Sequence, residues 1–221
     1  MKRKIRFYRQ HSPETCGISC ILMLLHVHGR VRYPTEKQER KLYSLYRCRA
    51  FMGTLPGAMA ECLMKNGLAV EMYHTSGRSL ANLNGYYPEE LYREILRENE
   101  QALDRIRHCV RIFTHWVFTP EWYREMLAAH DLAVQCAVPG DADGMHDRVL
   151  HWILLDGYAD GFFRAFDPMQ GRICLTEAEL MGYADTPVGM ICLAVENHLT
   201  GSREEGTDEM GKENCDVTCG L

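Results

Sequence analysis

The sequence predicts an α+β fold in which N-terminal helices pack on a C-terminal antiparallel sheet. Helix start and stop signals recur through the first half of the chain, whereas alternating, β-branched segments dominate the last third. The 221 residues, 46% hydrophobic and 25% charged, are enough for one sizeable core. We therefore expect a single domain over residues 1–198.

The first helix is the most apolar segment of the chain. Residues 10–29 read QHSPETCGISCILMLLHVHG. Ser12 can cap a helix, Pro13 suits a first turn, and Gly29 can end the helix in the left-handed conformation. Because residues 18–27 are apolar nearly all round, this helix is expected to be buried.

Cys16 is the first candidate for chemistry, since it falls in the first turn of that helix. Unpaired backbone N–H groups and the helix dipole stabilise a thiolate there, and Gly17 leaves room for a substrate backbone. Free cysteines are, however, among the most buried residue types, and the chain has ten. Cys16 therefore needs support from other residues.

The remaining elements follow from local signals. Helices are expected at about 35–46, 56–66, 88–113 and 119–130, and a strand at 68–74. Strands are expected at 132–138, 148–158, 161–167 and 188–195, and Asp160-Gly161 is a strong hairpin signal. A short helix, TEAEL, precedes the last strand. Residues 199–221 are acidic, glycine-rich and poor in apolar residues, so we expect a disordered tail.

Composition excludes several classes of function. The net charge of −5 and the absence of a basic stripe argue against nucleic acid as a partner. No C-x-x-C pair occurs, so neither a metal nor another cofactor is expected. The basic start is not followed by a signal-like apolar stretch, and the run at 18–27 is too short to span a bilayer. These features predict a cytoplasmic protein with no membrane partner; its oligomeric state stays open.

A thiol nucleophile needs a base, and the base needs an orienting group. His151 lies inside an expected strand, and Asp167 ends the next strand of the same hairpin, so the two side chains should lie close together. Asp156 competes for this role, but its offset of five from His151 places it on the opposite strand face. Gln10 and the backbone N–H of Cys16 could supply an oxyanion hole.

Each of these residues also has a simpler interpretation. His151 could be a hydrogen-bonded core histidine, Asp167 a turn cap before Pro168, and Gln10 an ordinary loop residue.

The motifs together resemble the papain-like cysteine peptidases. They are Gln10, the ETCG segment at 14–17 before an apolar helix, His151-Trp152 in a strand, and Asp167-Pro168 after a Y-x-D-G-F hairpin. The sequence is most similar to the bacteriocin-processing (double-glycine leader) peptidase family and its stand-alone relatives. The resemblance covers about 5–75 and 120–195; residues 76–119 look like a helical insertion. Thr15 departs from the acidic residue that commonly precedes the cysteine.

The resemblance implies a papain-like fold and a cysteine peptidase that cleaves a peptide or peptide-like substrate through an acyl-enzyme. It makes Cys16 the nucleophile, His151 the base, Asp167 the orienting residue and Gln10 an oxyanion donor. Two alternatives use the same fold: an acyl or γ-glutamyl transferase, and an inactive peptide-binding module.

Overall fold

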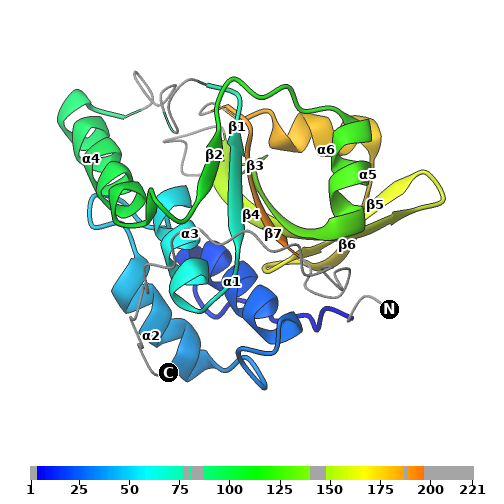
Figure 1. The fold of residues 1–221 in the computed structure, drawn as a ribbon, viewed down its shortest axis with the longest axis horizontal. Coiled ribbons are helices and arrows are strands. Elements are labelled where there is room, and N and C mark those ends of the chain that lie inside the picture. The colour runs from blue at the N-terminus through cyan, green and yellow to red at the C-terminus, as the bar shows by residue number, and fades with distance from the viewer. Residues whose placement is uncertain (1–3, 77–79, 81–86, 140–147, 187–188, 197–221) are drawn as a thin grey trace, which may run out of the picture.

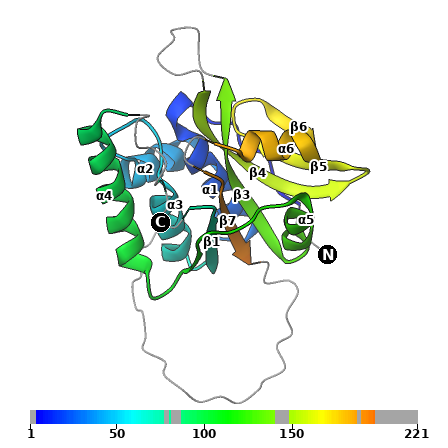
Figure 2. The same ribbon diagram turned by 90° about the horizontal axis from the view of Figure 1, so that it is seen from above.

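The computed structural model describes residues 4–76, 80, 87–139, 148–186 and 189–196, and it has an α+β architecture (Figure 1). Its centre is a seven-stranded sheet with the strand order β2-β1-β7-β3-β4-β5-β6. Helices cover both faces of this sheet, which the two views of the ribbon show (Figure 2). The expected tail at 199–221 lies outside the described residues.

Four helices lie on one face of the sheet. They are α1 (Cys16–Val27), α2 (Glu36–Tyr46), α3 (Pro56–Lys65) and α4 (Glu89–Ile106). Eleven residues of α1 are buried, as its apolar sequence predicts. The helix ends at Val27, and Gly29, two residues later, has a φ of 73°, which confirms the expected left-handed stop. One apolar cluster joins these helices to the sheet, so α1 is a rigid platform inside the core.

The strands of the sheet are mostly antiparallel. Their bounds are β1 (Val70–His74), β2 (Arg111–Phe113), β3 (His130–Pro139), β4 (Arg148–Ala159), β5 (Phe162–Asp167), β6 (Gly171–Thr176) and β7 (Ile191–Glu196). The single parallel pair among the described strands is β1 with β2. Asp160 and Gly161 form the β4–β5 turn, both with positive φ, so the Asp-Gly hairpin is confirmed.

The opposite face of the sheet carries α5 (Pro120–Ala129) and α6 (Glu177–Ala184). These helices bury a second apolar cluster that includes Tyr123 and Phe163. The expectation of helices packed on a sheet is therefore correct but incomplete, because the inner strands are covered from both sides (Figure 2).

Two expectations about secondary structure are wrong. The helix expected over 88–113 ends at Ile106, and residues 111–113 form β2 instead. Phe113 stacks on Tyr73 of β1 with ring centroids 4.5 Å apart, so long-range aromatic packing overrides the helical pattern. Strand β6 was not expected; its residues Gly171–Thr176 form a strand by antiparallel pairing with Phe162–Asp167 of β5.

Over the residues that the structure describes, no helix combines the length and the apolar character needed to cross a membrane.

Candidate active site

Cys16 is the first residue of α1 and is almost fully buried. The local approach differs from the expected one: residues Pro13–Thr15 form a short 3₁₀ turn, and the Ser12 side chain makes no capping hydrogen bond. The Ser12 carbonyl instead accepts a hydrogen bond from the Thr15 N–H at 3.2 Å. Cys16 still stands at the positive end of the α1 dipole, where negative charge on sulfur is stabilised.

The structure brings His151 and Asp167 together. His151 Nε2 lies 3.0 Å from Asp167 Oδ1, and both side chains are buried. The register explains the contact: Leu154 pairs with Phe166, which places Asp167 diagonally across the hairpin from His151. Cys16 lies near enough to the imidazole that, with Asp167, it raises the pKa of His151. Because Nε2 faces Asp167, Nδ1 is the ring nitrogen left for the thiol.

The two partners of His151 control its charge. Burial lowers the pKa of His151, but the hydrogen bonds and charges of Asp167 and Cys16 outweigh burial and raise that pKa to about 10. Burial also acts to raise the pKa of Asp167, yet its bonds with His151 and the turn hold this pKa below its usual value. The arrangement therefore favours a charged imidazole beside the Asp167 carboxylate at neutral pH.

Asp167 also caps a turn. It therefore makes both kinds of contact that the sequence suggested, one with His151 and one with the turn after β5. Its Oδ1 accepts hydrogen bonds from the backbone N–H groups of Met169 at 2.7 Å and Gln170 at 3.1 Å. The next carbonyl, that of Pro168, accepts the backbone N–H of Gln10 at 3.0 Å. The turn after β5 thus connects Asp167 to the N-terminal segment.

Asp156 lies elsewhere. It sits at the irregularity of β4 between Leu155 and Gly157. There it lines a separate cleft of about 460 Å³ together with Lys4, Arg164 and Arg172. Asp167, not Asp156, is the carboxylate that contacts His151.

Gln10 approaches the site but its amide is engaged. Its Nε2 donates to the carbonyls of Ser12 at 2.9 Å and Pro13 at 3.0 Å. Both amide protons are thus used inside the turn that precedes Cys16. Donation to an oxyanion requires the side chain to release at least one of these carbonyls.

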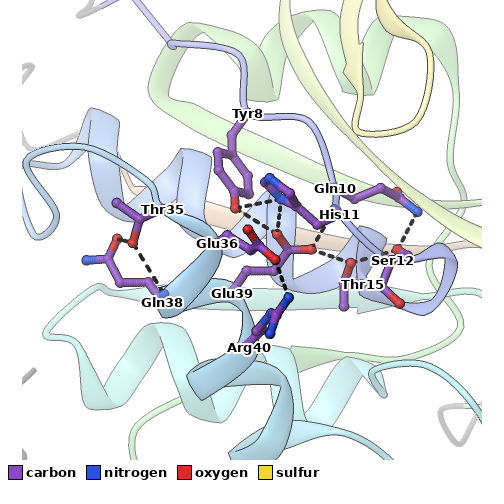
Figure 3. Close-up of polar contacts among 10 residues, drawn as sticks. All are labelled: Tyr8, Gln10, His11, Ser12, Thr15, Thr35, Glu36, Gln38, Glu39 and Arg40. Atoms are coloured by element: carbon purple, nitrogen blue, oxygen red, sulfur yellow. Dashed lines mark hydrogen bonds and ion pairs between the residues drawn. The ribbon is translucent and has the colours of Figure 1, made fainter.

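Sequence reasoning missed Glu39 of α2, a buried carboxylate beside the same turn (Figure 3). It accepts hydrogen bonds from the Tyr8 hydroxyl at 2.7 Å, from the His11 backbone N–H at 3.0 Å, and from the Thr15 hydroxyl at 2.5 Å. The His11 ring nitrogen Nδ1 lies 2.7 Å from it. Its spacing of three from buried Leu42 was the signal that Glu39 lies on the inner helix face.

The role expected for Gly17 is wrong. A Cβ at this position would lie 3.0 Å from Met59 Sδ and 3.3 Å from Thr54 Cβ and from a ring atom of Trp152. Protein side chains, not a substrate backbone, occupy the space beside Gly17. A pocket of about 70 Å³ opens next to Cys16, with walls that include Phe51, Leu150 and Trp152. Leu80 and Tyr87, from the segment expected as an insertion, also line it.

The cysteines of the described residues are free thiols. Most are buried, as expected for core thiols, but Cys109 and Cys174 are exposed. Within the same part of the chain, no group of three or more His, Cys, Asp or Glu side chains is placed to hold a metal ion.

The raised pKa of His151 predicts a loss of stability at alkaline pH. An imidazole with a pKa near 6.5 when unfolded and about 10 when folded contributes fully below about pH 6.5, and its contribution is lost as the pH rises through about 10. We expect urea unfolding to show wild type more stable than His151→Gln by about 2–4 kcal/mol near pH 6 and by much less near pH 10. An equal difference at both pH values would contradict the charged state.

Comparisons with known proteins find a likeness to solved structures. No family model and no curated protein matches the sequence. Among solved structures, the chain is similar to a double-glycine-motif protease from an AMS/PCAT transporter, crystallised in complex with the leader peptide. The identity is 13%, the match covers 89% of this chain and 94% of that chain, and the TM-score is 0.46. The functional conclusion below therefore rests on side-chain geometry in this chain.

Proposed function

We propose that this chain is a papain-like cysteine peptidase that hydrolyses a peptide or amide bond with a Cys16–His151–Asp167 triad. The observation that carries the proposal is the buried His151, whose Nε2 lies 3.0 Å from Asp167 Oδ1 and whose pKa is raised by both Asp167 and Cys16. A thiol at a helix start, a base and an orienting carboxylate from distant segments form the arrangement that nucleophilic catalysis requires.

The proposed reaction begins from a thiolate–imidazolium pair. The Cys16 thiolate attacks the substrate carbonyl, and the carbonyl oxygen becomes an oxyanion that accepts hydrogen bonds from the Cys16 backbone N–H and Gln10. His151 gives its proton to the leaving amine, and a thioester remains on Cys16. Neutral His151 then takes a proton from water, which attacks the thioester and releases the acid. Asp167 keeps the imidazole oriented and stabilises its positive charge.

A pocket opens directly beside Cys16, so a small activated ester can reach the thiol. N-acetylglycine p-nitrophenyl ester is a suitable probe of acylation, because glycine has no side chain to place. It reports p-nitrophenolate release, and intact mass spectrometry locates the acyl group.

Selective alkylation tests the state of the nucleophile. At neutral pH we expect iodoacetamide to modify Cys16 at least about tenfold faster than Cys20, because a thiolate is the reacting species. Cys20 lies one turn further along α1, where burial raises its pKa well above the usual value. Peptide mapping of the folded protein after timed quenching gives both rates. Cys109 and Cys174 provide exposed reference thiols in the same sample.

The outcomes separate the alternatives. Equal rates at Cys16 and Cys20 would contradict the peptidase and favour an inactive binding module. A reactive Cys16 whose acyl group is released faster by added amine than by water would favour a transferase. Release by water alone supports hydrolysis.

A further inference from the structure

We propose that Glu39 is a positioning residue, which fixes the segment from Tyr8 to Thr15 so that Gln10 and Cys16 meet the substrate in the correct geometry. This inference rests on the proposed function, and it assigns a task to a residue outside the triad and the oxyanion donors. Glu39 acts through its hydrogen-bond partners and not by contact with the reacting atoms.

The contacts of Glu39 enclose the turn that leads to the nucleophile (Figure 3). Tyr8 and His11 donate from the chain before the turn, and Thr15 donates from its end. Gln10 directly precedes His11, and Cys16 directly follows Thr15. Both His11 and Thr15 are hydrogen-bonded to Glu39. One carboxylate from α2 holds both ends of the segment that supplies the two groups.

The segment from Tyr8 to Thr15 also forms hydrogen bonds with the turn that follows Asp167. The Gln10 backbone N–H donates to the Pro168 carbonyl at 3.0 Å. Arg9 Nη1 donates to the Met169 carbonyl at 2.8 Å. The segment therefore bridges α2 and the residue that orients His151, and a shift at Glu39 would move Gln10 relative to the triad.

Burying a carboxylate costs free energy, so Glu39 is not explained by packing alone. An apolar side chain at position 39 would continue the inner face of α2, where Leu42 is buried. A buried anion is tolerated only when its oxygens are hydrogen-bonded. Burial acts to raise the pKa of Glu39, but the bonds from Thr15, His11 and Tyr8 lower it overall, so the group is ionised at neutral pH. All of these donors lie between Tyr8 and Thr15. The carboxylate of Glu39 therefore stabilises one conformation of that segment.

Glu36 provides a matched control. It lies one turn before Glu39 on α2, but it is exposed and pairs with Arg40. Glu39→Gln and Glu36→Gln are the same chemical change on the same helix. The glutamine at position 39 keeps the volume but has one acceptor oxygen in place of two, so it cannot accept from every donor in the network.

The experiment compares two reactions of Cys16 in each variant. Acylation by N-acetylglycine p-nitrophenyl ester passes through an oxyanion, whereas alkylation by iodoacetamide does not. For Glu39→Gln we expect acylation to fall about 10- to 100-fold, the effect of a small misplacement of catalytic groups, and alkylation to stay within about twofold. Glu36→Gln should leave both rates within about twofold. Thermal unfolding establishes that each variant is folded at the assay temperature.

Four results would overturn the inference. Acylation of Glu39→Gln equal to that of Glu36→Gln would remove the positioning role. A parallel loss of acylation and alkylation would make Glu39 a residue of general stability only. If Glu39→Gln is unfolded, Thr15→Val tests the inference instead, because it removes one of the hydrogen-bond donors to Glu39. Unchanged acylation in Thr15→Val would reject the inference. A wild type whose Cys16 is never acylated would instead reject the proposed function, and this inference with it.

Discussion

Replacement of His151 by glutamine is expected to lower acylation of Cys16 by about a hundredfold to a thousandfold at neutral pH, the usual contribution of a general acid–base residue. Asp167 and Cys16 raise the pKa of this imidazole. In the proposed mechanism, its loss removes both the group that activates the Cys16 thiol and the proton donor. Acylation is measured with N-acetylglycine p-nitrophenyl ester, and the adduct is located by intact mass.

Folding must be separated from chemistry in this experiment. His151 is buried, and His151→Ala would leave a cavity as well as an uncharged site. Glutamine fills more of that volume and can still donate to Asp167. A cooperative unfolding transition with wild-type rates of acylation would show that His151 is only a core histidine.

The second large effect concerns the orienting carboxylate. Asp167→Ala is expected to lower acylation about a thousandfold, because the imidazole loses the group that fixes its tautomer and stabilises its charge. Asp167→Asn should be less damaging and keep measurable turnover. Its side-chain oxygen can still accept from the Met169 and Gln170 N–H groups, so the turn after β5 is preserved. The same acylation rate for both variants would contradict an orienting role through hydrogen bonds, because both substitutions remove the charge and only asparagine keeps the acceptor oxygen.

Asp156→Asn is the matched control for Asp167. It removes one carboxylate from the same hairpin, but from the cleft shared with Lys4, Arg164 and Arg172. We expect acylation within about twofold of wild type, as for most substitutions away from a site. A loss as large as that of Asp167→Ala, in a folded variant, would make Asp156 the third residue.

Local signals predicted much of this molecule. The all-round apolar run after Cys16 required a buried helix, and Gly29 ended it because only a left-handed residue suits that stop. The Asp160-Gly161 turn sets the β4–β5 register as far as Gly157, and the irregularity between Leu155 and Gly157 then moves Asp167 one residue closer to His151. These features depend on periodicity and turn geometry, and both are carried by neighbouring residues.

Local sequence patterns did not predict the contacts between distant segments. Residues 111–113 have a helical pattern in the sequence but pair with β1, because Phe113 gains more by stacking on Tyr73. The Gln10 amide is engaged by its own turn, and Gly17 is covered by Met59, Thr54 and Trp152. No local rule states which side chains will fill a given space.

The sequence by itself determined the α+β class, the helix that begins at Cys16, and the hairpin that brings His151 towards Asp167. Only the tertiary structure decided that Asp167 is the partner of His151 by direct contact and that Glu39 holds the turn before Cys16. The reason is physical: a helix or hairpin is specified by residues a few positions apart, whereas a buried carboxylate finds its donors 24 to 31 positions away in the chain. Such pairs form only when the packed core fixes where each segment lies.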